Sequence, residues 1–149
     1  MADKWGRRLF AGGASVMVLL GIVHILSLFA VPVPANDSER QLSELMASYR
    51  FDMMGSMRTM NDLLRGFSIS FLVAAIVMGS LSLALRHERP ALLKKLALIN
   101  TIWLAALTTI SVRYFFAAPT SFLMAGLVAY GAAWVMLPSG SLKPALDTP

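Results

Sequence analysis

The sequence predicts an all-α integral membrane protein, a bundle of four transmembrane helices whose two ends lie on the cytoplasmic side. The chain of 149 residues is 57% hydrophobic and only 14% charged, whereas soluble domains carry roughly 25% charged residues. Its apolar residues form four long blocks, as lipid-exposed helices require, because the hydrocarbon core cannot hydrogen-bond an exposed backbone. Its positive charges lie mostly in the short segments between the blocks, where they set topology.

The same composition argues against several other classes of protein. A net charge of +5 is compatible with nucleic-acid binding, but the basic residues form no patch interleaved with aromatic side chains, so no nucleic-acid partner is predicted. The chain has no cysteine, which excludes disulfides, thiolate metal sites and cysteine nucleophiles. No HExxH, GxSxG or phosphate-binding glycine loop is present. We therefore predict no metal, no cofactor and no catalytic residue.

The first span is predicted at residues 9–31, behind a basic and aromatic anchor at residues 4–8. An apolar run of about 23 residues crosses a hydrocarbon core of roughly 30 Å at about 1.5 Å per residue. A cleaved secretory signal peptide is the alternative, with residues 33–35 as the cleavage site. The apolar run is longer than such segments usually are, so we expect an uncleaved helix.

Three further spans complete a single transmembrane domain over residues 1–137. They are predicted at residues 61–85, 92–116 and 120–137. Pro90 suits the first turn of the third of the four helices. Beyond the last span, residues 138–149 are predicted to be a disordered cytoplasmic tail because they are polar and rich in proline.

Residues 32–60 are predicted to form an external loop that carries a short amphipathic helix. Pro32 and Pro34 end the first span, and either Asn36 or Asp37 caps a helix from Ser38 to about Tyr49. The apolar residues of this helix recur at helical spacing, at Leu42, Leu45, Met46 and Tyr49. We expect this face to lie on the membrane surface or to cover the bundle.

The orientation follows from the distribution of lysine and arginine. Three basic residues precede the first span, four lie in residues 86–95 and one lies in the tail. The opposite side carries five, four of which are interleaved with acidic residues. The excess of positive charge predicts that both termini are cytoplasmic and that residues 32–60 are external.

Seven polar residues are predicted to line a ligand-binding cleft at the external side. They are His24, Asp52, Arg58, Asn61, Asp62, Arg65 and Arg113. If the second long helix begins near Gly55, four of the seven share one of its faces, at i, i+3, i+4 and i+7. Polar groups at membrane depth are costly unless they pair or meet water, so a convergent set indicates a hydrated cleft.

A structural role is the alternative for the same residues. Charges at helix ends mark the membrane interface, and long arginine side chains reach it without any ligand. Asp62 paired with Arg65 or Arg113 would hold helices together, and Asp52 is a further candidate partner for Arg113. His24 is a candidate proton carrier or metal ligand, or a neutral imidazole that hydrogen-bonds a serine or asparagine of a neighbouring helix.

Small and hydroxyl-bearing residues are predicted to join the helices. On the last span Ala125, Ala129 and Ala133 repeat every four residues, a face that packs within the bundle or against another copy of the chain. The third and second spans carry hydroxyl and amide residues predicted to hydrogen-bond between helices, at Asn100, Thr101, Thr108, Thr109, Ser111, Ser68 and Ser70.

Three stretches carry a resemblance to a known family. They are residues 51–56 (FDMMGS), Gly66-Phe67, and residues 113–116 (RYFF) with Pro119. Over nearly its whole length the chain resembles a family of small four-helix proteins of the bacterial inner membrane, which has no established activity. The DoxX-like group, with a comparable layout, is a more distant analogy. The resemblance implies a multi-pass location in that membrane and draws attention to these positions.

Two residues of the first stretch have predicted local roles. Gly55 supplies the backbone freedom that the turn into the second long helix needs, and Asp52 caps the start of that helix.

Three functions are compatible with this sequence. The leading hypothesis is a non-enzymatic binding or accessory subunit that holds a lipid, a quinone or a partner membrane protein in the external cleft. The first alternative is a small membrane enzyme or redox accessory that uses His24 with Asp62 or Asp52 as acid and base. The second is an oligomeric, transporter-like protein, which the lack of inverted similarity between the two halves disfavours.

Overall fold

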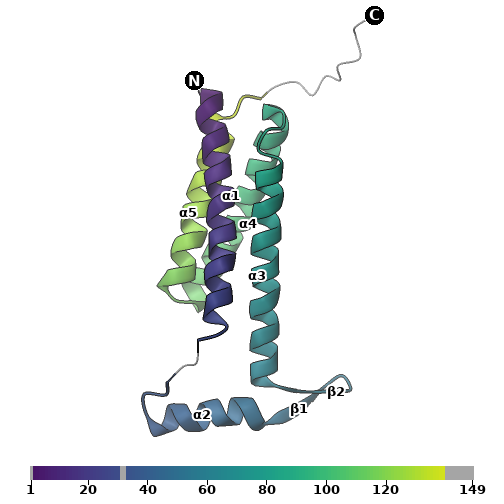
Figure 1. The fold of residues 1–149 in the computed structure, drawn as a ribbon, viewed down its shortest axis with the longest axis vertical. Coiled ribbons are helices and arrows are strands. Elements are labelled where there is room, and N and C mark those ends of the chain that lie inside the picture. The colour runs from purple at the N-terminus through teal and green to yellow at the C-terminus, as the bar shows by residue number, and fades with distance from the viewer. Residues whose placement is uncertain (1, 31–32, 140–149) are drawn as a thin grey trace, which may run out of the picture. The chain divides into compact units, whose positions relative to one another are not determined.

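The computed structural model describes residues 2–30 and 33–139, which are mostly helical (Figure 1). The elements within these residues are α1 (Ala2–Ser27), α2 (Asp37–Ser48), β1 (Arg50–Met53), β2 (Ser56–Thr59), α3 (Met60–Ala84), α4 (Pro90–Tyr114) and α5 (Ala117–Met136). Four of these helices, α1, α3, α4 and α5, are long and apolar enough to cross a membrane. The helical class and the four long apolar helices predicted from the sequence are therefore confirmed.

The chain forms two compact units. Unit 1 comprises Met1–Leu20 and Ala75–Pro149, and so contains most of α1, the end of α3, and all of α4 and α5. Unit 2 is Gly21–Ala74, with the end of α1, the helix α2, the strands β1 and β2, and the first part of α3.

In unit 1, α4 and α5 pack side by side along most of their length. Buried residues recur every three or four positions on α4, at Leu93, Ala97, Asn100, Leu104, Thr108 and Ser111. The facing positions of α5 are Leu123, Gly126, Tyr130 and Ala133. This spacing gives each helix one buried face, as the helical repeat requires.

Helix α1 packs against α5 through an aromatic contact. The Phe10 ring meets the Tyr130 ring edge to face, with 5.3 Å between the ring centres, and both side chains are buried. Gly13 makes room for this contact, because a Cβ atom at Gly13 would lie 2.9 Å from Cδ2 of Tyr130. The tyrosine therefore occupies the space that a larger residue at position 13 would take.

The end of α3 packs equally closely against α1. A Cβ atom at Gly79 would lie 2.8 Å from the carbonyl oxygen of Ala14 and 2.9 Å from the backbone nitrogen of Val18. Such contacts let dispersion forces act between two backbones, as in the small-residue interfaces of membrane helices. Gly79 thus sets how near these two helices lie.

Hydrogen bonds between side chains join the helices of unit 1 at two levels. Asn100 Nδ2 donates to Ser82 Oγ at 3.3 Å, and the hydroxyls of Ser111 and Thr120 lie 2.7 Å apart. Asn100 and Ser111 therefore join helices as predicted. Thr101 and Thr109 do not, since each hydroxyl donates to a carbonyl of its own helix; this internal bond is available to any helical threonine.

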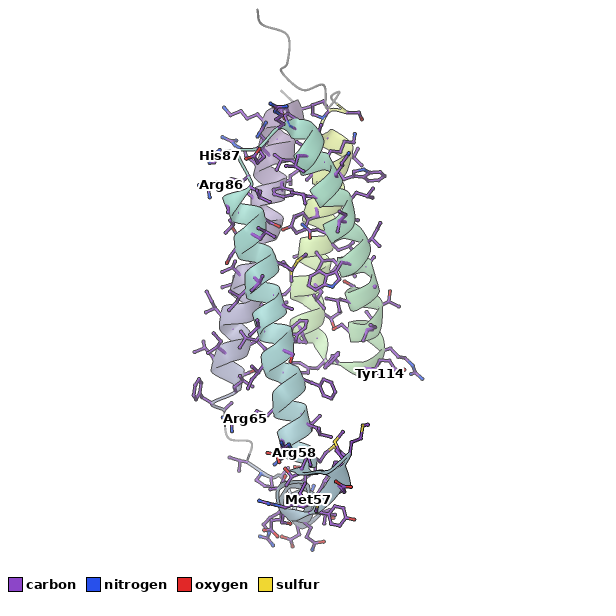
Figure 2. The ribbon with its side chains drawn as sticks, turned by 90° about the vertical axis from the view of Figure 1, so that its right-hand side faces the viewer. Met57, Arg58, Arg65, Arg86, His87 and Tyr114 are labelled. Carbon is purple, nitrogen blue, oxygen red and sulfur yellow. The ribbon has the colours of Figure 1, made fainter. Side chains whose placement is uncertain are left out.

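Two basic residues at one end of unit 1 bind backbone carbonyls beyond helix ends. Arg7 donates to the carbonyl oxygen of Glu88 at 2.8 Å and to that of Arg86 at 3.3 Å, and Lys94 Nζ donates to the carbonyl oxygen of Leu137 at 2.8 Å. The last carbonyls of a helix lack partners within it, so Lys94 satisfies a group that α5 leaves open, while Arg7 ties α1 to the turn that follows α3. Arg86 lies at the turn between α3 and α4 (Figure 2).

The small-residue face predicted on α5 is divided. Ala125 is exposed, but Ala133 is fully buried in the core of unit 1. The prediction gave two places for this face, within the bundle or against another copy of the chain; Ala133 packs within the bundle, whereas Ala125 does not. The reason is that the helical repeat of about 3.6 residues rotates a four-residue pattern gradually around the helix.

In unit 2, α2 forms where the short amphipathic helix was predicted. Asn36 caps it: the Glu39 N–H donates to Asn36 Oδ1 at 2.9 Å, and the Ala35 N–H donates to the Glu39 carboxylate at 2.7 Å. The pair resembles a capping box, although Glu39 accepts from the residue before the cap rather than from the cap itself. Within unit 2 the helix runs crosswise to α3 (Figure 1), and none of its residues is buried.

A β-hairpin follows α2 where the sequence predicted only loop. Arg50 pairs with Thr59 and Met53 with Ser56 in an antiparallel ladder. Met54 and Gly55 form the turn, with φ values of 53° and 87°, as tight hairpin turns of the primed types require. A methionine is an unusual residue for this conformation, so the sequence carried little turn signal.

The limits of the long helices also differ from the predicted spans. Helix α1 runs from Ala2 to Ser27 rather than over residues 9–31, and its basic anchor is helical. Helix α3 begins at Met60, not near Gly55, because the hairpin occupies the preceding residues. Residues 31–32 and 140–149 lie outside the described residues, and with them lie the predicted role of Pro32 and nearly all of the predicted tail.

We expect Gly79→Ala to destabilise the protein although alanine is the better helix former. The new methyl group would clash with the backbone of α1, and overpacking of this kind costs about 1–3 kcal/mol. Gly12→Ala is the matched control, because nothing lies within 4 Å of a Cβ atom there; it should be neutral or stabilising by up to about 1 kcal/mol. Unfolding of the two variants in mixed detergent micelles measures this difference, and equal stabilities would contradict the close approach.

Candidate functional site

Six of the seven predicted site residues lie in unit 2, and Arg113 lies in unit 1. The predicted pairing of Arg113 with Asp52 or Asp62 joins the two units and stays a prediction. Within unit 1 the Arg113 guanidinium lies 6.0 Å from the centre of the Tyr114 ring. Both of these side chains are exposed, at the end of α4 (Figure 2).

A shallow pocket in unit 2 brings together two of the predicted residues. Its volume is about 280 Å³, and it is lined by Arg58, Asp62, Leu63, Gly66, Phe67 and Ser70. Arg58 comes from β2 and the other residues from one side of α3. Figure 2 shows Met57 and Arg58 where β2 joins α3, with Arg65 farther along the helix.

The hairpin places Arg58 in the lining of this pocket. The prediction that Arg58, Asn61, Asp62 and Arg65 share a helix face is wrong, because Arg58 belongs to a strand. Strand β2 ends at Thr59 and α3 begins at the next residue, so Arg58 still lines the same pocket as Asp62. Asn61 and Arg65 are exposed and do not line the pocket.

Arg58 has no carboxylate partner within the described residues, where the ion pairs are Arg7–Asp3 and Arg40–Asp37. Its guanidinium donates to the carbonyl oxygen of Met57 at 3.0 Å. A guanidinium has five N–H donors, so most of its hydrogen-bonding capacity is available to a ligand.

Asp62 caps the start of α3. Its Oδ2 accepts from the Thr59 N–H at 2.9 Å, and the Asp62 N–H donates to Thr59 Oγ1 at 3.1 Å. This is the capping-box arrangement, and a negative charge at a helix N-terminus is favourable. The alternative pairing of Asp62 with Arg65 is not found in unit 2. Asp62 therefore has a structural role, but a different one from the predicted ion pair between helices.

Asp52 stabilises the hairpin turn rather than a helix. Its Oδ1 accepts from the Gly55 N–H at 2.9 Å, a local bond typical of aspartate at turns. The prediction that Asp52 caps α3 is wrong because the hairpin separates it from the helix start. The prediction that Gly55 supplies backbone freedom is supported by its positive φ, although the turn joins two strands.

His24 lies apart from the pocket lining, near the end of α1. Its ring meets the Phe71 ring edge to face, with 5.6 Å between the ring centres. Its Nε2 atom is inaccessible and has no hydrogen-bond partner among the described residues. The predicted hydrogen bond from the imidazole to a serine or asparagine is therefore not made at Nε2.

Sequence reasoning missed the apolar part of the pocket. Leu63, Phe67 and Ser70 follow one another at spacings of four and three residues, which place them on one side of α3 next to Asp62. Gly66 lies between them and leaves the helix surface open. This spacing beside Asp62 was the signal that could have found these residues. The pocket combines a cation and a carboxylate with an apolar helix surface.

Comparison with known proteins adds no assignment. No family model, no curated protein and no solved structure matches this chain.

We expect Thr59→Ala to lower the free energy of unfolding by about 1 kcal/mol, the usual cost of losing an N-cap residue. Thr109→Ala is the matched control, because that hydroxyl is exposed and bonds only to its own helix. Mixed-micelle unfolding of both variants checks the difference. Asp62→Ala should shift stability in the same direction as Thr59→Ala. A fully stable Thr59→Ala protein would show that the capping box does not hold α3 in place.

Proposed function

We propose that the chain is a multi-pass protein of the bacterial inner membrane, with four spanning helices and both termini in the cytoplasm. The outward sides of the helices in unit 1 support this proposal. Large aliphatic residues are 63–72% exposed there, at Ile102, Val128 and Val135. Exposure of such side chains to water is unfavourable, whereas lipid is as apolar as they are. The distribution of basic residues supports the orientation.

Reporter fusions test the topology. Green fluorescent protein fused after Leu137 should fluoresce, and alkaline phosphatase at the same position should be inactive. Alkaline phosphatase inserted between Met54 and Gly55 should be active, because the hairpin is proposed to be external. The reverse pattern of activities would overturn the orientation, and recovery of detergent-free soluble protein would overturn the membrane location.

We further propose that the chain is a non-enzymatic binding or accessory subunit and that its ligand occupies the Arg58 pocket. The observation that carries this proposal is the position of Arg58, a cation without a carboxylate partner beside the apolar surface of α3. Phe67 in the same pocket is 71% exposed. A ligand with a polar or anionic group and an apolar body matches both features. A lipid, a quinone or a helix of a partner protein has this chemistry.

The enzymatic alternative has less support from the geometry. It requires His24 to work with Asp62 or Asp52, but each carboxylate already accepts a backbone N–H bond in its own segment. His24 does not line the pocket that holds Asp62. A transporter-like function also has less support, because α3, α4 and α5 are continuous helices, whereas secondary transporters commonly use broken ones.

A photocrosslinking experiment tests the pocket. A benzophenone side chain in place of Phe67 should form a defined adduct with a lipid, a quinone or a protein in cell membranes. Arg58→Gln should reduce this adduct severalfold, because the polar group of the ligand loses its charge-assisted partner. Arg40→Gln is the matched control; it removes an exposed arginine of unit 2 that does not line the pocket.

The same side chain at position 69 supplies the second control, since Ile69 is exposed on α3 but does not line the pocket. Equal adducts at positions 67 and 69, unaffected by Arg58→Gln, would reject the pocket as a binding site.

A further inference from the structure

A larger groove lies in unit 1, beside α1 and along α5. Its volume is about 700 Å³, and it is lined by Leu9 of α1 and by Thr120, Ser121, Met124, Ala125, Val128 and Ala129 of α5. The lining of α5 repeats in adjacent pairs every four residues, so it forms one strip along the helix. The strip is roughly 14 Å long at about 1.5 Å per residue.

The groove has no unused hydrogen-bonding hydroxyl. Thr120 donates to the carbonyl oxygen of Phe116 at 2.9 Å, and Ser121 donates to that of Ala117 at 2.8 Å. The remaining lining residues are apolar, and the small side chains of Ala125 and Ala129 leave the groove open. A hydrocarbon chain suits such a surface, whereas a ligand that needs hydrogen bonds along its length does not.

A cation and an indole lie one helical turn beyond the groove. Trp5 precedes Leu9 by four residues and therefore lies on the same side of α1. The Arg8 guanidinium lies 5.3 Å from the centre of the Trp5 ring, and both side chains are exposed. Tryptophan prefers the level of the lipid headgroups, and a guanidinium forms strong paired hydrogen bonds with phosphate.

We propose that this groove binds one anionic phospholipid, with an acyl chain along α5 and the phosphate at Arg8. The site is distinct from the Arg58 pocket, although it rests on the proposed membrane location. Basic residues next to an apolar helix surface at the cytoplasmic side attract anionic lipids over neutral ones. The cation and the indole lie together beyond the Leu9 end of the groove, and the hydrocarbon surface follows, as the acyl chain follows the headgroup in a phospholipid.

A second copy of the chain is a less suitable occupant. Two copies related by an axis along the membrane normal would bring Lys4 and Arg8 of one copy to the same level as those of the other. Helix α5 has no charged residue to offset that repulsion. An anionic headgroup would neutralise the same charges.

The lipid preference can be measured through Trp5 in a protein whose other tryptophans are replaced, Trp103→Phe with Trp134→Phe. The protein is reconstituted in phosphatidylcholine vesicles, and a share of the lipid is exchanged for brominated phosphatidylglycerol or brominated phosphatidylcholine, since bromine quenches nearby indole fluorescence. We expect stronger quenching by the anionic lipid. Arg8→Gln should lower this preference about fivefold. Lys95→Gln, which removes an exposed cation of α4, should leave most of it.

Filling the groove supplies an independent readout. Ala125→Leu should reduce quenching by the anionic lipid, because the added side chain occupies the space of the acyl chain. Ala106→Leu, at an exposed position of α4, is the matched control and should have no effect. Circular dichroism of each variant verifies its helical content.

Three outcomes would overturn the site. They are equal quenching by the two brominated lipids, equal losses in Arg8→Gln and Lys95→Gln, and efficient disulfide crosslinking between copies through cysteines placed at position 125. A chain that does not insert into vesicles would show no quenching by either lipid. That result would reject the membrane location itself, and it is distinguishable from a failure of lipid selectivity.

Discussion

The close packing of α1 against its neighbours determines much of unit 1. Gly13 leaves space for the Tyr130 ring, and Gly79 lets the backbones of α1 and α3 nearly touch. These contacts fix where the first turns of α1 lie. Arg7 can then reach the carbonyls that follow α3, and Leu9 lines the groove beside α5. A displacement of α1 would remove the packing, the carbonyl partners and one wall of the groove together.

Several polar side chains of unit 2 hydrogen-bond to the backbone. Asp62 and Asp52 each accept a main-chain N–H, and Asn36 caps α2 in the same way. This use is expected at helix starts and turns, because backbone N–H groups there have no partner within the element. It also leaves Arg58 as a charged residue of the pocket that structural bonding does not explain. The functional proposal depends on that contrast.

The Arg58 pocket of unit 2 and the groove along α5 in unit 1 have similar chemistry. Each combines a cation, Arg58 or Arg8, with an apolar helix surface, and in neither is an ion pair with a carboxylate recorded for that cation among the described residues. An amphipathic molecule suits both. They differ in the rest of the lining: Asp62 gives the first pocket a carboxylate, whereas the groove on α5 is apolar along its length. The first therefore favours a ligand with mixed polar groups and the second an anionic lipid.

The sequence alone determined the four long apolar helices and narrowed the cap of α2 to Asn36 or Asp37, because hydrophobic blocks and capping residues are local signals. It did not determine the hairpin: the turn at Met54 and Gly55 lacks the usual asparagine, and the two strands stabilise each other only when paired. Because the strands pair, Arg58 lies near the end of a strand and not on the predicted helix face, and Asp52 bonds to the hairpin turn. Only the tertiary structure decided that Ala133 faces the core while Ala125 stays exposed, because the side of a helix that is buried depends on its neighbours.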